Sequence, residues 1–365
     1  MISHLMRVFF FSFITFILLL ASSVPAEEIA SAEPTGSGVT VLIYHRFGEN
    51  KYPSTNIALD RFSEQLEFLR NNNYQVIPLE QLVHSLKGKS KLPDRAVVIT
   101  IDDGYRSVYT NAWPALKQYG YPFTVFVYVK ATDNKHWNYM TWSQIKEMKA
   151  AGVDFQNHGF AHDHMAFKPP EMNMDEYKAW IRADLAVSTR ILSEELNERP
   201  RFFALPYGEY NKTVLDEIRS FGYEAIFLQD PGSVSKDTDS FAIPREPILG
   251  NDWATMEHFQ TILERVDLPF NSVNPTSGIL ANAKPDKFSA RLLYPERYNS
   301  SSLGIYVSEL GWQKASLEGD VVKVDNSSAL QRPINRVAVS GKEKESGRTA
   351  IRFWLLIHEE TGESQ

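Results

Sequence analysis

The apolar residues of this chain fall into short runs that alternate with helical patterns from residue 39 to about residue 253. Short runs, most of them mainly apolar, predict strands at 39–44, 74–77, 96–101, 123–129, 153–156, 201–205 and 223–228. Between them, apolar residues recur at helical spacing, as at Phe62, Leu66 and Leu69. This alternation predicts a mostly parallel sheet, either a barrel or an open doubly wound sheet. A count of about seven strand–helix units favours a barrel one unit short of the standard eight.

The pattern changes near residue 268. Residues 269–286 hold several Pro, Asn and Ser residues and predict a linker. The short apolar segments after it show little helical periodicity, and turn signals such as Glu318-Gly319-Asp320 separate them. We therefore expect residues 39–268 to form an α/β barrel and residues 287–365 a small β-sandwich, whose role the pattern leaves open.

The first 26 residues have the pattern of a secretory signal peptide. Arg7 precedes an apolar run over residues 8–20, and Val24-Pro25-Ala26 supplies small residues for cleavage. An uncleaved N-terminal anchor is the alternative, although the run is short for a membrane span. We expect an exported protein, periplasmic or secreted, with residues 27–38 as a linker and no stable membrane insertion after signal cleavage.

Composition narrows the functional classes. The 365 residues include 38 Lys and Arg against 45 Asp and Glu, for a net charge of −7, which argues against a nucleic-acid partner. The absence of cysteine excludes disulfides, thiolate metal sites and a cysteine nucleophile. The chain also lacks a Gly-x-Ser-x-Gly elbow and a glycine-rich phosphate loop, which disfavours serine hydrolases and phosphate-binding enzymes. The oligomeric state stays open.

Two adjacent acids follow one of the apolar strands. Asp102 and Asp103 come directly after Ile101, and Gly104 follows them. The carboxyl ends of buried parallel strands are where barrel sites are built. Adjacent side chains at a strand end point in different directions, so one acid can bind a metal while the other handles a proton. A solvated turn is the alternative.

Two histidines follow another strand. His158 and His162 are four residues apart, which places two imidazoles on one side of a turn. With Asp103 they make three ligands and leave a position for water, as in a catalytic site of the zinc type. His164 is a competing ligand, and Asp163 is a candidate partner for a ligating histidine. A surface histidine cluster is the alternative.

The third candidate is the loop Pro206-Tyr207-Gly208, which follows the predicted strand at 201–205. Its Pro and Gly indicate a shaped turn with an accessible backbone. The N–H of Tyr207 could therefore face a developing oxyanion. An ordinary turn is the alternative reading of this loop.

In this order, the three motifs resemble those of the polysaccharide deacetylase family, the NodB-homology group also called carbohydrate esterase family 4. They read Thr100-Ile101-Asp102-Asp103-Gly104, His158-Gly159-Phe160-Ala161-His162 and Leu205-Pro206-Tyr207-Gly208. The resemblance covers about residues 39–255 and implies a distorted (β/α)7 barrel that hydrolyses N-acetyl groups of a glycan with a metal ion.

The resemblance also implies roles for residues. Asp103, His158 and His162 would bind one divalent metal, zinc in the first instance, with nickel, cobalt or iron as alternatives. Asp102 would be the general base, and the Tyr207 N–H would help hold the oxyanion.

The chain departs from the family pattern at two places. Ala204 stands where the family often has an arginine that orients the catalytic acid, and Arg245 is the candidate replacement, with a plain structural arginine as the alternative. The family also uses a late histidine as general acid, and His258 is the late candidate here. However, His45 ends the first strand, as in relatives acting on poly-β-1,6-N-acetylglucosamine, whose barrel is circularly permuted. We therefore expect His45 to be the acid, with a structural histidine as the alternative.

These expectations combine into one function. We expect a hydrolase that removes N-acetyl groups from an extracellular or cell-envelope polysaccharide of the poly-N-acetylglucosamine type, such as a biofilm glycan. An O-acetyl esterase on xylan or another glycan is the first alternative, and a non-catalytic glycan-binding protein is the second. Trp137 and Tyr139 are candidates for a sugar platform.

Overall fold

The computed structural model describes residues 38–93 and 95–358. The expected signal peptide over residues 1–26, and all but the last residue of the linker expected to follow it, lie outside this part of the chain. Within the described residues, none of the helices combines the length and the apolar character needed to span a bilayer.

Seven parallel strands form the sheet that positions the site. Their order is β10-β1-β5-β6-β7-β8-β9, and the short strand β4 (Gln75–Val76) pairs with β5 off this path. The strands are β1 (Thr40–Tyr44), β5 (Ala96–Ile101), β6 (Thr124–Val127), β7 (Asp154–Asn157), β8 (Phe202–Ala204), β9 (Ala225–Phe227) and β10 (Glu246–Pro247).

The segment that ends in β10 touches both edges of this sheet. Ile243 bridges to Phe227 of β9 in parallel, and its N–H donates to the carbonyl of Ile226 at 3.0 Å. Three residues later, Glu246 pairs with Leu42 of β1. The sheet is therefore a distorted (β/α)7 barrel, which confirms the fold class predicted from the alternating pattern.

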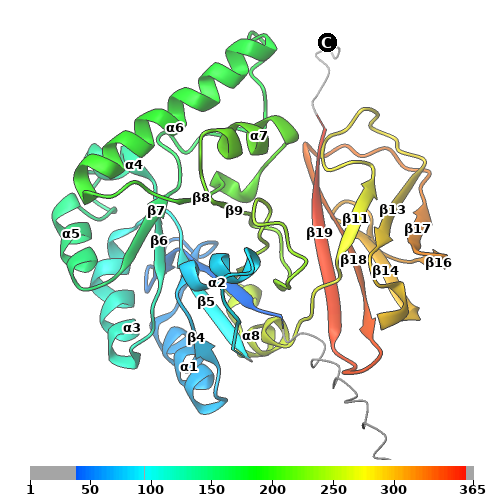
Figure 1. The fold of residues 1–365 in the computed structure, drawn as a ribbon, viewed down its shortest axis with the longest axis horizontal. Coiled ribbons are helices and arrows are strands. Elements are labelled where there is room, and N and C mark those ends of the chain that lie inside the picture. Colours follow the sequence, from blue (N-terminus) through cyan, green and yellow to red (C-terminus); the bar gives the residue numbers. More distant parts are fainter. Residues whose placement is uncertain (1–37, 94, 359–365) are drawn as a thin grey trace, which may run out of the picture. The chain divides into compact units, whose positions relative to one another are not determined.

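Helices surround the strands (Figure 1). They are α1 (Leu59–Asn71), α2 (Leu79–Leu86), α3 (Trp113–Tyr119), α4 (Val129–Asp133), α5 (Trp142–Ala150), α6 (Met174–Leu196), α7 (Lys212–Ser220) and α8 (Met256–Leu263). Helix α5 begins with a capping box between Thr141 and Gln144, and α3 ends at Gly120 with φ of 68°. These caps satisfy backbone groups that a helix end would otherwise leave free.

The strands β1 and β5 are mostly apolar because both of their faces are covered. All residues of β1 and β5 are buried. Val41 and Val98 belong to an apolar cluster with residues of other strands and of α2, whereas Leu42 and Ile99 belong to a cluster with residues of α1, α3, α5 and α8. Burial on both faces explains why these strands read as continuous hydrophobic runs rather than as alternating ones.

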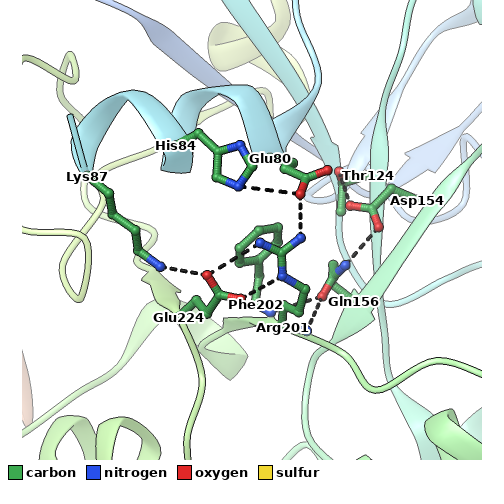
Figure 2. Close-up of polar contacts among 9 residues, drawn as sticks. All are labelled: Glu80, His84, Lys87, Thr124, Asp154, Gln156, Arg201, Phe202 and Glu224. Carbon is green, nitrogen blue, oxygen red and sulfur yellow. Dashed lines mark hydrogen bonds and ion pairs between the residues drawn. The ribbon is translucent and has the colours of Figure 1, made fainter. Parts of the chain in front are cut away.

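Charged side chains form a network at the amino ends of the strands (Figure 2). Arg201, just ahead of β8, donates to Glu224 at 2.6 Å and to Glu80 of α2 at 2.5 Å. Asp154, the first residue of β7, accepts a hydrogen bond of 2.8 Å from the Thr124 hydroxyl of β6. The network connects α2 to this end of the barrel, and in this architecture the chemistry lies at the opposite end.

After α8, the described residues form strands and one short 3-10 helix (Pro295–Arg297) (Figure 1). One sheet has the order β11-β13-β17-β16 and the other β12-β19-β18-β14-β15, and a single apolar cluster fills the space between them. The strands are β11 (Phe270–Asn274), β12 (Gly278–Ile279), β13 (Lys287–Leu292), β14 (Tyr298–Val307), β15 (Gly311–Lys314), β16 (Ser316–Glu318), β17 (Val321–Asp325), β18 (Ile334–Glu343) and β19 (Thr349–Ile357).

One element differs from the sequence expectation. The range 269–286, read as a linker from its Pro, Asn and Ser content, contains β11 and β12. β11 pairs with β13, and β12 pairs with β19 near the end of the chain. Backbone hydrogen bonds to these partners order a segment whose local composition favours turns.

Candidate active site

The sequence motifs meet at the carboxyl ends of the barrel strands. Asp102 and Asp103 follow β5, His158 follows β7, Tyr207 lies in the turn after β8, and His45 follows β1. A cavity of about 500 Å³ opens there. Its lining consists of His45, Thr55, Asp102, Asp103, Tyr105, Tyr128, Tyr139, His158, Ala161, His162, Tyr207, Gln229 and Leu249.

Asp103, His158 and His162 form a group that could hold a metal ion. The Nε2 atoms of His158 and His162 lie 3.4 and 3.1 Å from the same oxygen, Oδ1 of Asp103. One ligand atom from each residue falls within 4.8 Å of the others. Oδ1 of Asp103 is buried and has no hydrogen-bond partner among the described residues. An orphaned carboxylate oxygen facing two imidazole nitrogens fits a divalent cation.

The tautomer of His158 suits a metal ligand. Its Nδ1 lies 2.8 Å from the carbonyl oxygen of Ala204, so Nδ1 carries the proton and Nε2 presents its lone pair to Asp103. Burial alone would lower the pKa of His158, but the carboxylates of Asp102 and Asp103 outweigh it and raise the pKa. Burial would likewise raise the pKa of Asp103, yet the two histidines bring it well below its usual value.

The turn between the two histidines is held by Asp184 of α6, which the sequence analysis missed. The backbone N–H groups of Phe160 and Ala161 each donate to its carboxylate at 2.8 Å. A side chain at Gly159, where φ is 80°, would meet this carboxylate at 3.1 Å. Asp184 lies in the middle of a long amphipathic helix, where no local signal distinguishes it from a solvated acid.

Asp102 is paired with Arg245 in the barrel interior. Nη1 and Nη2 of Arg245 donate to the two carboxylate oxygens at 2.7 and 2.8 Å, and Arg245 has no exposed surface. Its remaining donors reach the Thr100 hydroxyl at 3.1 Å and the Leu228 carbonyl at 2.7 Å. Burial would raise the pKa of Asp102, but the Arg245 guanidinium outweighs it and lowers the pKa. The geometry keeps Asp102 ionised and fixes its orientation.

His45 lines the cavity, whereas His258 does not. Burial lowers the pKa of His45, partly opposed by the carboxylates of Asp103 and Asp102. Its Nδ1 is buried without a hydrogen-bond partner among the described residues. His258 lies on α8 with its ring 5.3 Å from that of Trp253. Of the two histidines considered as the acid, the structure brings His45 to the motif residues.

Tyr207 adopts a left-handed backbone conformation, with φ of 58° and ψ of −1°. The N–H of Gly208 donates to the Leu205 carbonyl at 2.9 Å and closes the turn. The ring of Tyr207 stacks on His164 with centroids 3.9 Å apart, and Nδ1 of His164 lies 2.7 Å from the Glu209 carboxylate. His164, the competing ligand in the sequence, thus packs on Tyr207 and is not in the metal-ligand group.

Aromatic side chains form one wall of the cavity. Tyr105 and Tyr139 have ring centroids 4.7 Å apart, and the guanidinium of Arg46 lies 3.4 Å above the Tyr105 ring. Tyr139, one of the two expected sugar contacts, therefore lines the cavity. Trp137, the other, is 64% exposed and is not among the lining residues.

Comparisons with known proteins point to one family. A family model described as polysaccharide deacetylase matches residues 89–226. The chain is 26% identical over 226 residues to the poly-beta-1,6-N-acetyl-D-glucosamine N-deacetylase of Staphylococcus epidermidis. The alignment covers 60% of this chain and 75% of that protein. It is 27% identical over 233 residues to the Escherichia coli (strain K12) protein of the same name, covering 54% of this chain and 34% of that protein.

A solved structure extends the match to the fold. IcaB from Ammonifex degensii is 30% identical, with a TM-score of 0.53, and the alignment covers 62% of this chain and 96% of that one. The three motifs, the barrel that presents them and these similarities give one conclusion: the chain belongs to the polysaccharide deacetylase family of enzymes.

Proposed function

We propose that this protein is a metal-dependent hydrolase that removes N-acetyl groups from a polysaccharide of the poly-N-acetylglucosamine type. The observation that supports it most is the meeting of Asp102 with Asp103, His158 and His162 in one cavity. The substrate class follows from the named activity of the Staphylococcus epidermidis and Escherichia coli relatives. Such a glycan lies outside the cytoplasm, which agrees with the signal-peptide pattern of residues 1–26.

Asp103, His158 and His162 would hold the metal. Their two imidazoles and one carboxylate suit zinc, with nickel, cobalt and iron as alternatives. When bound, such an ion lowers the pKa of water towards neutrality and polarises a carbonyl group. The hydrogen bond from His158 to the Ala204 carbonyl and the contacts of Asp184 keep the two imidazoles in place for this role.

The other residues would divide the proton transfers. Asp102, held by Arg245, accepts a proton from the attacking water as the water oxygen bonds to the acetyl carbon. The Tyr207 N–H donates to the oxyanion, and one such donor is worth about 3 kcal/mol. His45 gives a proton to the sugar nitrogen as the carbon–nitrogen bond breaks, because an amide anion is too poor a leaving group. The products are acetate and a free amine on the sugar.

Acetate release tests this proposal. The purified protein is treated with chelator, restored with Zn²⁺, Ni²⁺, Co²⁺ or Fe²⁺, and given oligomers of poly-β-1,6-N-acetylglucosamine, chitin oligomers or acetylated xylan. We expect metal-dependent acetate from the first substrate. Asp102→Asn should lower kcat by about 10²–10⁴-fold while keeping the metal, because it removes the base but not a ligand. Asp237→Asn, at an exposed acid of the barrel, is the matched control.

Other outcomes would replace the proposal. Acetate from xylan alone would make the protein an O-acetyl esterase. A protein that binds one metal per chain but releases no acetate would instead be a glycan-binding member of the family. Asp102→Asn with wild-type kcat would remove Asp102 from the role of base.

A further inference from the structure

A side chain from the C-terminal strands reaches the Tyr207 turn. Arg336 lies on β18, and its Nη2 donates to the carbonyl oxygen of Tyr207 in a long contact of 3.4 Å. Its Nε donates to Oδ1 of Asp230 at 3.0 Å. Arg336 and Tyr207 are 129 positions apart in the chain. A residue outside the barrel is therefore in contact with a residue that lines the cavity.

The face of the sheet that carries Arg336 packs on the barrel. Val337 and Val339 of β18 point into the core between the two C-terminal sheets, so Arg336 lies on the opposite face. Leu355 of β19, paired with Arg336 across the sheet, shares an apolar cluster with Tyr210 and other barrel residues. The Arg336 N–H also donates to the Ser308 hydroxyl at 2.7 Å. A paired strand thus presents the guanidinium, which limits its movement relative to the turn.

Asp230 connects Arg336 with the segment that follows Tyr207 and with the backbone of Arg245. Asp230 is 1% exposed, and its second carboxylate oxygen accepts a hydrogen bond of 2.7 Å from the Tyr210 hydroxyl. Tyr210 lies three residues after Tyr207. The backbone carbonyl of Asp230 accepts from the N–H of Arg245 at 3.0 Å. The carboxylate is buried, so its charge needs a partner, and the Arg336 guanidinium is one.

The conformation of Tyr207 depends on contacts of this kind. A residue other than glycine is strained at a φ of 58°, and such a conformation persists only where the surroundings hold it. His164 holds the ring of Tyr207 from the barrel side. Arg336 holds its backbone carbonyl from the side of the C-terminal sheet.

We propose that Arg336 is a positioning residue that keeps the Tyr207 turn in the conformation that aims its N–H at the oxyanion. The C-terminal strands then complete the active site, in addition to extending the fold. This inference rests on the proposed role of Tyr207 in deacetylation. It assigns a task to a part of the chain that lies outside the residues matched by the family model.

A pair of matched substitutions separates positioning from stability. Arg336→Met removes both contacts and keeps the length of the side chain. Arg352→Met is the control, because Arg352 of the same sheet pairs with buried Asp267 at 3.2 Å and is not among the cavity residues. We expect Arg336→Met to lower kcat about tenfold with KM unchanged. This loss is smaller than the ~10²–10³-fold decrease in kcat that follows removal of an oxyanion donor. Arg352→Met should keep the wild-type kcat, with a similar loss of melting temperature.

Chemical rescue gives a second readout. Added guanidinium ion should restore part of the kcat of Arg336→Met, and Arg336→Lys should lie between this variant and the wild type. A purely structural arginine would not respond in this way. Equal kcat values for Arg336→Met and Arg352→Met would overturn the inference.

Failure of the proposed function can be told apart from failure of this inference. If the wild-type protein releases no acetate from any of the three substrates, the function fails. Hydrogen exchange of the backbone amides of residues 207–210 then decides the inference. Faster exchange in Arg336→Met than in Arg352→Met supports it, and equal exchange overturns it.

Discussion

Replacing Arg245 by methionine tests how the barrel interior tolerates the charge of Asp102. The substitution removes the two hydrogen bonds to Asp102 and those to the Thr100 hydroxyl and the Leu228 carbonyl. The Asp102 side chain is only 3% exposed, so water can compensate little of the lost guanidinium charge. A carboxylate is left buried without its counter-charge.

The cost follows from that geometry. Removing one partner of a buried ion pair destabilises a protein by about 3–5 kcal/mol, mostly because the remaining charge is uncompensated. With Asn at position 102 the buried Arg245 guanidinium is the group that lacks a counter-charge. Arg245→Met then removes that charge together with its hydrogen bonds, so it should cost at most about 1–2 kcal/mol. We therefore expect a coupling free energy of at least about 2 kcal/mol between the two positions.

Urea unfolding of the wild type, Arg245→Met, Asp102→Asn and the double variant measures the coupling. The proteins are unfolded in the presence of chelator, so that metal binding does not contribute to stability. Arg190→Met is the control, because Arg190 and its partner Glu194 are 58% and 60% exposed and their pair should be worth no more than about 1 kcal/mol. The reasoning is refuted if Arg245→Met costs the same in the Asp102→Asn background as in the wild type.

Two further predictions concern stability away from the site. Burial lowers the pKa of His258 to about 4. Between pH 6.5 and 4 the unfolded chain therefore binds more protons than the folded one, and the free energy of unfolding decreases as the pH is lowered. His258→Gln should weaken this dependence, and an unchanged curve of melting temperature against pH would contradict it. At the amino ends of the strands, Arg201 pairs with Glu224 and Glu80 (Figure 2). Because all three are about a third exposed or more, Arg201→Gln should cost about 1 kcal/mol in urea unfolding and leave acetate release unchanged, and a loss of activity at wild-type stability would oppose this reading.

Local patterns were enough to predict the barrel and part of its cavity. Strands buried on both faces are mostly apolar, so runs such as residues 96–101 stand out in a chain read alone. Each motif follows a predicted strand, and the carboxyl ends of parallel strands lie at one end of a barrel. The meeting of Asp103, His158 and His162 could be expected for this reason, and the structure brings them together.

Contacts between residues that are distant in the chain could not be predicted in this way. The range 269–286 has the composition of a linker, yet partners in β13 and β19 make strands of part of it. Asp184 appears as an ordinary acid of a helix until the fold places it under the histidine turn.

The same distinction separates the motif residues from the residues that hold them. Asp102 could be identified from its strand, and the family resemblance named Arg245 as a candidate to orient it. Only closure of the barrel brings the two side chains together across 143 positions. Nothing in the local pattern around Arg336 points to Tyr207. The sequence alone indicated most of the barrel strands and the chemical groups that end them, because hydrophobic pattern and spacing are local properties. Only the tertiary structure decided which groups orient the others, because those contacts join strands and sheets far apart in the chain.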